Sequence, residues 1–90
     1  MYKLLIVEDD LIIAQGLQKH FEKYHYEVSC VENFENVLDD FIQYKPDFVL
    51  LDIHLPFFDG YYWCQEIRKI SQVPIVFISS ANENMNIVLA

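Results

Sequence analysis

Hydrophobic residues fall in two alternating patterns along this chain. The first is a short run that is apolar at nearly every position, which predicts a β-strand. Four such runs are present, at residues 2–7, 27–31, 48–51 and 75–78. The third reads Phe-Val-Leu-Leu, and a strand that is apolar throughout is typical of a sheet covered by helices on both faces.

The second pattern has apolar residues recurring every three or four positions, which predicts a helix between successive strands. Asp10 can cap the first helix, and Pro46 prevents the second from continuing. Asp59 and Gly60 form a turn or capping signal before the third, and residues 82–90 begin another helical pattern. Strands that alternate with helices indicate βαβ units with right-handed crossovers, and therefore a parallel sheet between helices.

The composition fits one small cytoplasmic domain with a dense core. Of 90 residues, 53% are hydrophobic and 16% aromatic, unlike a disordered chain. A formal net charge of -8 disfavours nucleic acid and anionic lipid as ligands, and favours a metal cation or a basic partner surface. The sequence has no signal-peptide pattern and no apolar run near the roughly 20 residues of a membrane span. Cys30 and Cys64 are in no metal-ligand spacing and indicate free thiols.

Acidic residues follow two of the predicted strands. Glu8, Asp9 and Asp10 come directly after the first strand, and Asp52 comes directly after the third. In an open parallel sheet the functional site lies beyond the carboxyl ends of the strands, where the strand order reverses. If the first and third strands are neighbours, these carboxyl groups disfavour each other's ionisation. A hard divalent cation with oxygen ligands offsets that repulsion, so the sequence predicts an Mg²⁺ site.

A metal beside a carboxylate suggests phosphoryl transfer, with an aspartate attacking phosphorus while the metal neutralises the phosphoryl oxygens. Asp52 is the better nucleophile candidate because it stands alone at a strand end, whereas Glu8 and Asp9 are adjacent and suited to metal binding. Each residue also has an ordinary structural interpretation, such as a helix cap for Asp10. Ser79, which follows the fourth strand, is either a turn residue or a donor to a phosphoryl oxygen.

The segments KLLIVEDD, FVLLDIHLPFFDG and VPIVFISS resemble, in order and spacing, the receiver domains of bacterial two-component response regulators. The resemblance covers essentially the whole chain. It implies a flavodoxin-like α/β fold with parallel strand order 2-1-3-4-5 and helices on both faces. Residues 59–68, with 77–80, are more specifically similar to the OmpR-type winged-helix regulators. Within those, they resemble the branch of Gram-positive bacteria that answers cell-wall-active peptide antibiotics.

The resemblance also implies a role for each residue of the site. Asp52 corresponds to the phospho-accepting aspartate, and Asp9 to the direct Mg²⁺ ligand. Glu8 corresponds to the acid that reaches the metal through water, and His54 to the position whose backbone carbonyl binds the metal. Ser79 corresponds to the hydroxyl residue that closes on the phosphoryl group.

The family pattern continues with a fifth strand that ends in lysine and proline, and with a last helix. The sequence shows neither, so the interpretation is a receiver domain that spans residues 1–90 and lacks its fifth strand and last helix. In that case residues 75–78 would form an exposed sheet edge.

The function implied by the resemblance is a signalling switch rather than an enzyme, with at most self-phosphorylation and self-dephosphorylation activity. A sensor histidine kinase would phosphorylate Asp52 and so change transcription through a DNA-binding domain outside these residues. Whether the protein forms a homodimer is left open by the resemblance. The alternative is an Mg²⁺-dependent phosphatase with an aspartate nucleophile, which would normally carry that residue after the first strand. A flavin-binding module of the flavodoxin type is excluded, because it needs a phosphate-cradling loop where this chain has three acids.

Overall fold

A mostly parallel sheet lies at the centre of the molecule. The computed structural model describes residues 1–79 and 86–89. The five strands are β1 (Lys3–Val7), β2 (Glu27–Cys30), β3 (Phe48–Asp52), β4 (Ile75–Ser79) and β5 (Asn86–Leu89). They lie in the order β2-β1-β3-β4-β5, and the first four are parallel. The order 2-1-3-4-5 predicted from the sequence is therefore confirmed.

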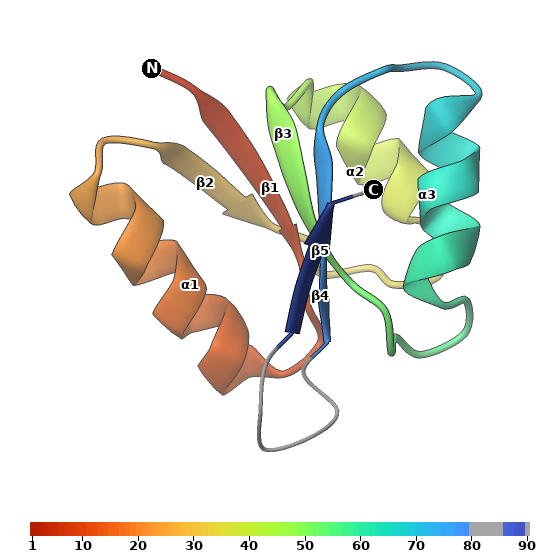
Figure 1. Ribbon diagram of the computed structural model, residues 1–90, viewed down its shortest axis with the longest axis horizontal. Helices are drawn as coiled ribbons and strands as arrows, with labels where there is room; N and C mark the ends of the chain where they lie inside the picture. The colour runs from red at the N-terminus through yellow and green to blue at the C-terminus, as the bar shows by residue number, and fades with distance from the viewer. Residues whose placement is uncertain (80–85, 90) are drawn as a thin grey trace.

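Helices cover both faces of the sheet, as Figure 1 shows. Helix α1 (Leu11–Lys23) lies on one face, and α2 (Val37–Tyr44) and α3 (Gly60–Arg68) lie on the other. Each helix begins after a side chain that accepts hydrogen bonds from the N–H groups of the first turn. These caps are Asp10, Asn36 and Asp59. The capping roles expected of Asp10 and Asp59 are present.

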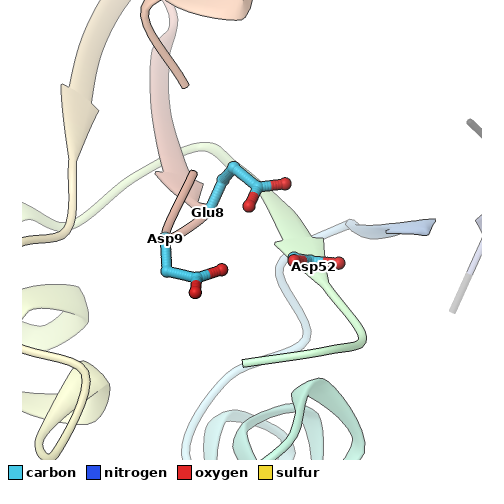
Figure 2. A group of neighbouring side chains, drawn as sticks. All are labelled: Glu8, Asp9 and Asp52. Atoms are coloured by element: carbon cyan, nitrogen blue, oxygen red, sulfur yellow. The ribbon is translucent and has the colours of Figure 1, made fainter. Parts of the chain in front are cut away.

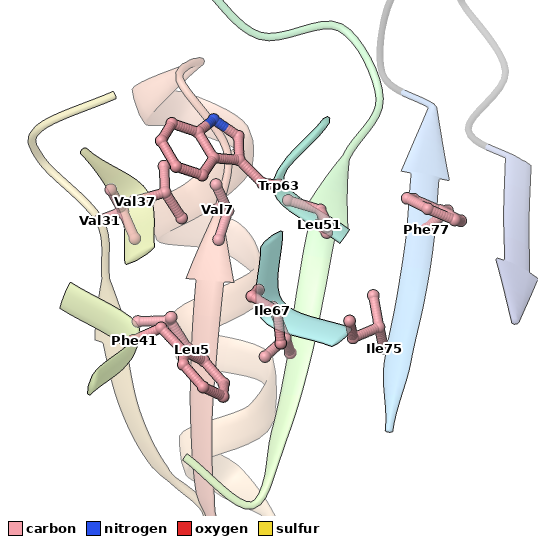
Figure 3. Packing of buried hydrophobic residues seen from close by; sticks show 11 residues of the cluster. Leu5, Val7, Val31, Val37, Phe41, Leu51, Trp63, Ile67, Ile75 and Phe77 are labelled. Atoms are coloured by element: carbon pink, nitrogen blue, oxygen red, sulfur yellow. The ribbon is translucent and has the colours of Figure 1, made fainter. Parts of the chain in front are cut away.

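The core consists of two clusters, one on each face of the sheet. Between the sheet, α2 and α3, Leu5 and Val7 of β1 pack with Trp63 and Ile67 (Figure 3). On the α1 face, a smaller cluster contains Leu4, Ile6, Ala14 and Leu50. Alternate residues of β1 thus enter opposite clusters, and each fully buried aliphatic side chain contributes roughly 1.5–3 kcal/mol. The central strands are firmly held, and so are the residues at their ends.

The segment after β4 differs from the sequence-based expectation. Residues 82–90 were expected to begin a helix, yet Asn86–Leu89 is a strand that pairs antiparallel with β4. The expected exposed edge at 75–78 is therefore wrong, because β5 pairs with β4. Since β5 is antiparallel and ends at Leu89, it is not the parallel strand ending in lysine and proline that was expected to be absent. Residues 82–85 and 90 lie outside the described residues.

The physical reason lies in the edge of β4. A buried strand with an unpaired edge presents a row of N–H and C=O groups, and a β-prone segment can satisfy them. Ile87 and Val88 are β-branched, which favours a strand. Residues 80–85 are too few for a parallel crossover, which needs about a dozen residues, so the pairing is antiparallel.

Candidate functional site

Three carboxylates meet at the carboxyl edge of the sheet. Glu8 and Asp9 follow β1, and Asp52 is the last residue of β3. Since Val7 lies opposite Leu51 in the parallel pairing, the two strands end side by side. One carboxylate oxygen from each of the three residues lies within 4.8 Å of the others (Figure 2). The structure therefore brings together three of the residues that the sequence singled out.

Two of these three carboxyl groups are buried. Glu8 is 2% exposed and Asp52 is 1% exposed, whereas Asp9 is exposed. A buried carboxylate needs hydrogen-bond donors. The N–H of Asp10 donates to Glu8 Oε2 at 3.0 Å, and the N–H of His54 donates to Asp52 Oδ1 at 3.2 Å. The backbone beyond each strand thus holds one buried carboxylate, and Asp9 lies nearer to solvent.

This donor set suits a hard divalent cation. Three negative groups this close repel each other, and that repulsion is relieved when a cation lies between them. Mg²⁺ binds oxygen at about 2.0–2.1 Å, so two ligands on one ion stand up to about 4.2 Å apart. The chemistry of these residues therefore fits Mg²⁺.

The other predicted site residues lie at the same edge. His54 is exposed, and its backbone N–H is the donor to Asp52 Oδ1. Ser79 ends β4 one residue beyond Ile78, which is the partner of Asp52 in the sheet. These positions are compatible with the predicted roles of the His54 carbonyl and the Ser79 hydroxyl, which stay predictions.

Gly60 is a residue whose importance the sequence reasoning missed. A Cβ on Gly60 would lie 2.3 Å from the carbonyl oxygen of Asp52. The N–H of Gly60 donates to the carbonyl of Ile53 at 2.9 Å, while the N–H of Ile53 donates to the carbonyl of Ile78 at 3.0 Å. The start of α3 therefore packs directly on the backbone that carries Asp52. An Asp-Gly pair indicates a turn, and only the fold reveals this close approach.

The fold and the site together define a class of protein. It is the doubly wound α/β domain with strand order 2-1-3-4-5 and a cluster of acidic residues where the strand order reverses. The comparison with known families identifies the member of this class. The chain belongs to the response regulator receiver domain family, whose family model matches residues 4–90.

Three relatives illustrate the match. Transcriptional regulatory protein YvcP of Bacillus subtilis, described as uncharacterized, is 52% identical over 90 residues, which are 100% of this chain and 38% of YvcP. The N-terminal domain of the nisin resistance regulator NsrR, a lantibiotic response regulator, is 45% identical with a TM-score of 0.83. That comparison covers 96% of this chain and 73% of the NsrR chain.

The third relative is TrrA of Thermotoga maritima, solved in complex with Mg²⁺-BeF. It is 30% identical with a TM-score of 0.83, over 91% of this chain and 72% of TrrA. TrrA has also been solved in complex with the histidine kinase ThkA.

These comparisons confirm the receiver-domain interpretation and the similarity to OmpR-type regulators of antibiotic response. Response regulators are signalling proteins, and nothing in the comparisons supports the phosphatase alternative. The chain spans 38% of the length of YvcP, a regulator of transcription. Within the described ranges, no helix combines the length and apolar character needed to cross a bilayer.

Proposed function

We propose that Asp52 of this chain accepts a phosphoryl group from a sensor histidine kinase, and that Mg²⁺ is required. The observation that carries the proposal is the cluster of Glu8, Asp9 and Asp52, whose oxygens lie within 4.8 Å of one another. Asp52 is the member that ends a strand alone and is held from the backbone of the following loop.

Each residue of the site has a different proposed role. Asp9 and Asp52 would hold the ion directly, Glu8 through water, and the His54 carbonyl would add a further oxygen. When bound, Mg²⁺ neutralises charge on the phosphoryl oxygens. The N–H of His54 donates to Oδ1 of Asp52 and so helps to hold the carboxylate in place.

In the transfer itself, one bond replaces another. In the proposed step, a carboxylate oxygen of Asp52 forms a bond to phosphorus while the bond from phosphorus to the kinase histidine nitrogen breaks, and the electron pair of that bond stays on the imidazole. The Ser79 hydroxyl would then donate a hydrogen bond to a phosphoryl oxygen. Self-phosphorylation from small donors and hydrolysis of the acyl phosphate would use the same residues.

In the whole protein this reaction would act on transcription in the cytoplasm. The relatives YvcP and NsrR are regulators, and the chain matches 38% of the length of YvcP. DNA binding would belong to an effector domain outside the 90 residues, since the net charge of -8 opposes binding by the receiver itself.

Intact-mass analysis after incubation with acetyl phosphate and Mg²⁺ tests the proposal. The expected result is one phosphoryl adduct that is absent without Mg²⁺ and absent in Asp52→Ala. Glu35→Gln is the matched control, because Glu35 is an exposed acid outside the cluster, and it should keep the adduct. An adduct that persists in Asp52→Ala would assign the phosphate to another residue.

A further inference from the structure

Phe57 has a backbone conformation that bulky residues rarely adopt. Its φ is 68°, in the left-handed region. The N–H of Phe58 donates to the carbonyl of Pro56 at 2.8 Å, which closes a three-residue turn centred on Phe57. A γ-turn with positive φ is rare and strained. Such strain persists in a bulky residue only where something else determines the conformation, and it is concentrated at functional sites.

Burial within the domain does not offset this strain, because Phe57 is 70% exposed. The loop around it is nevertheless well anchored. Leu55 packs against the core, and the backbone of Ile53 is hydrogen-bonded to both β4 and Gly60. The fold thus fixes both ends of the loop and presents one strained aromatic side chain to solvent.

The loop lies at the edge of the sheet that carries Asp52. The loop runs from Asp52 to α3 along the end of the molecule where the parallel strands end (Figure 1). Phe58, 41% exposed, stacks on Tyr62 with ring centroids 4.3 Å apart. Phe57, Phe58 and Tyr62 therefore place an exposed aromatic surface on the loop and helix that follow the proposed phosphate acceptor.

We propose that Phe57 contacts the kinase that donates phosphate and helps to determine which kinase this chain accepts, an inference that rests on the proposed function. A protein donor must bring its phosphorus into contact with Asp52, so its surface covers the loop that begins there. Exposed aromatic residues are the side chains that most often anchor such interfaces. The nearby exposed acids Asp9 and Asp59 favour a donor surface that is apolar at the phosphohistidine and basic around it.

The test compares two donors on the whole protein. The first is acetyl phosphate, which is too small to cover the loop. The second is a histidine-phosphorylated kinase fragment, selected from a panel because the unmodified protein accepts its phosphate. In Phe57→Gly, the ratio of the kinase rate to the acetyl phosphate rate is expected to fall about tenfold, the effect of truncating one aromatic anchor. Phe57→Tyr, which keeps the ring, should restore the ratio.

His25→Gly is the matched control, because His25 is also exposed with a positive φ of 67° but follows α1. Both glycine variants should raise the melting temperature by about 4 °C through relief of strain, whereas only Phe57→Gly should lower the ratio. An unchanged ratio in Phe57→Gly, or an equal fall in His25→Gly, would overturn the inference. Failure of the unmodified protein to accept phosphate from either donor would instead contradict the proposed function. Uptake from acetyl phosphate but from no kinase would contradict a kinase as the partner.

Discussion

Asp40 carries a carboxyl group in an unfavourable setting. It is partly buried in the first turn of α2, and burial, followed by the charges of Asp39 and Glu32, raises its pKa above the usual value. A raised folded-state pKa means that the fold favours the protonated form. The ionised carboxyl therefore lowers stability at neutral pH, and this cost disappears as the pH falls below the unfolded value of about 3.9.

Asp40→Asn should accordingly raise the melting temperature at pH 7 by about 2 °C, a small effect because solvent screens a group this exposed. The gain should shrink to nothing as the pH falls below about 4. Thermal melts between pH 3 and pH 8 measure it. Glu35→Gln is the control, since it removes an exposed charge that is not among the causes of this shift. A gain that grows toward low pH would contradict the sign of the shift.

Single residues differ in how well the sequence reveals them. Glu8, Asp9 and Asp52 are predictable, because each follows an apolar run and parallel strands end at one edge of a sheet. Gly60 and Phe57 are not. Their importance depends on a close backbone approach and on a dihedral angle, and neither leaves a pattern in the order of residues.

At the scale of elements, the junction between β3 and α3 has little room. Gly60→Ala would place a methyl group 2.3 Å from the carbonyl oxygen of Asp52, which is backbone and cannot rotate away. Overpacking of this kind costs roughly 1–3 kcal/mol, and the melting temperature should fall by about 10 °C. Because the displaced backbone carries Asp52, phosphate uptake from acetyl phosphate should slow as well.

Gly16 provides the comparison within the same chain. It lies inside α1 and is exposed, and a Cβ added to it would have nothing within 4 Å. Gly16→Ala should stabilise the protein by roughly 0.5–1 kcal/mol, since alanine restricts the unfolded chain. Denaturant titration of both variants checks the pair. Equal changes in stability in the two variants would mean that the Asp52 carbonyl does not prevent a larger side chain at residue 60.

The elements that the sequence predicts correctly are those fixed by local pattern. The first four strands and three helices follow from apolar runs, helical spacing and caps such as Asp10. Asn86–Leu89 was predicted incorrectly because four residues fit either period. Its structure depends on the edge of β4, which is a long-range partner rather than a local signal.

For the whole molecule, electrostatic repulsion limits stability. The net charge is -8, and three of the negative groups meet in one site. A cation that binds only the folded state adds about 1.4 kcal/mol at ten times its dissociation constant. Mg²⁺ at that concentration should therefore raise the melting temperature by about 8 °C.

Asp9→Asn separates the effect of the Asp9 charge on metal-free stability from its effect on Mg²⁺ binding. It should raise the melting temperature of the metal-free protein, because it removes one of three like charges, and should weaken Mg²⁺ binding about tenfold. Melts over an Mg²⁺ titration report both quantities, with Glu35→Gln as the control for loss of one exposed charge. A wild-type protein with no Mg²⁺-dependent shift would argue against a metal site in the cluster.

The hydrogen bonds of Ile53 have a mechanical consequence. This residue directly follows Asp52, its N–H is bound to β4, and its carbonyl is bound to the start of α3. Three elements thus meet at one residue, next to the close approach of Gly60 to the Asp52 carbonyl. Because Ile53 is hydrogen-bonded on both sides, a small displacement at this residue cannot be absorbed by the loop alone. A movement of the Asp52 backbone would therefore displace the start of α3 and the end of β4 together.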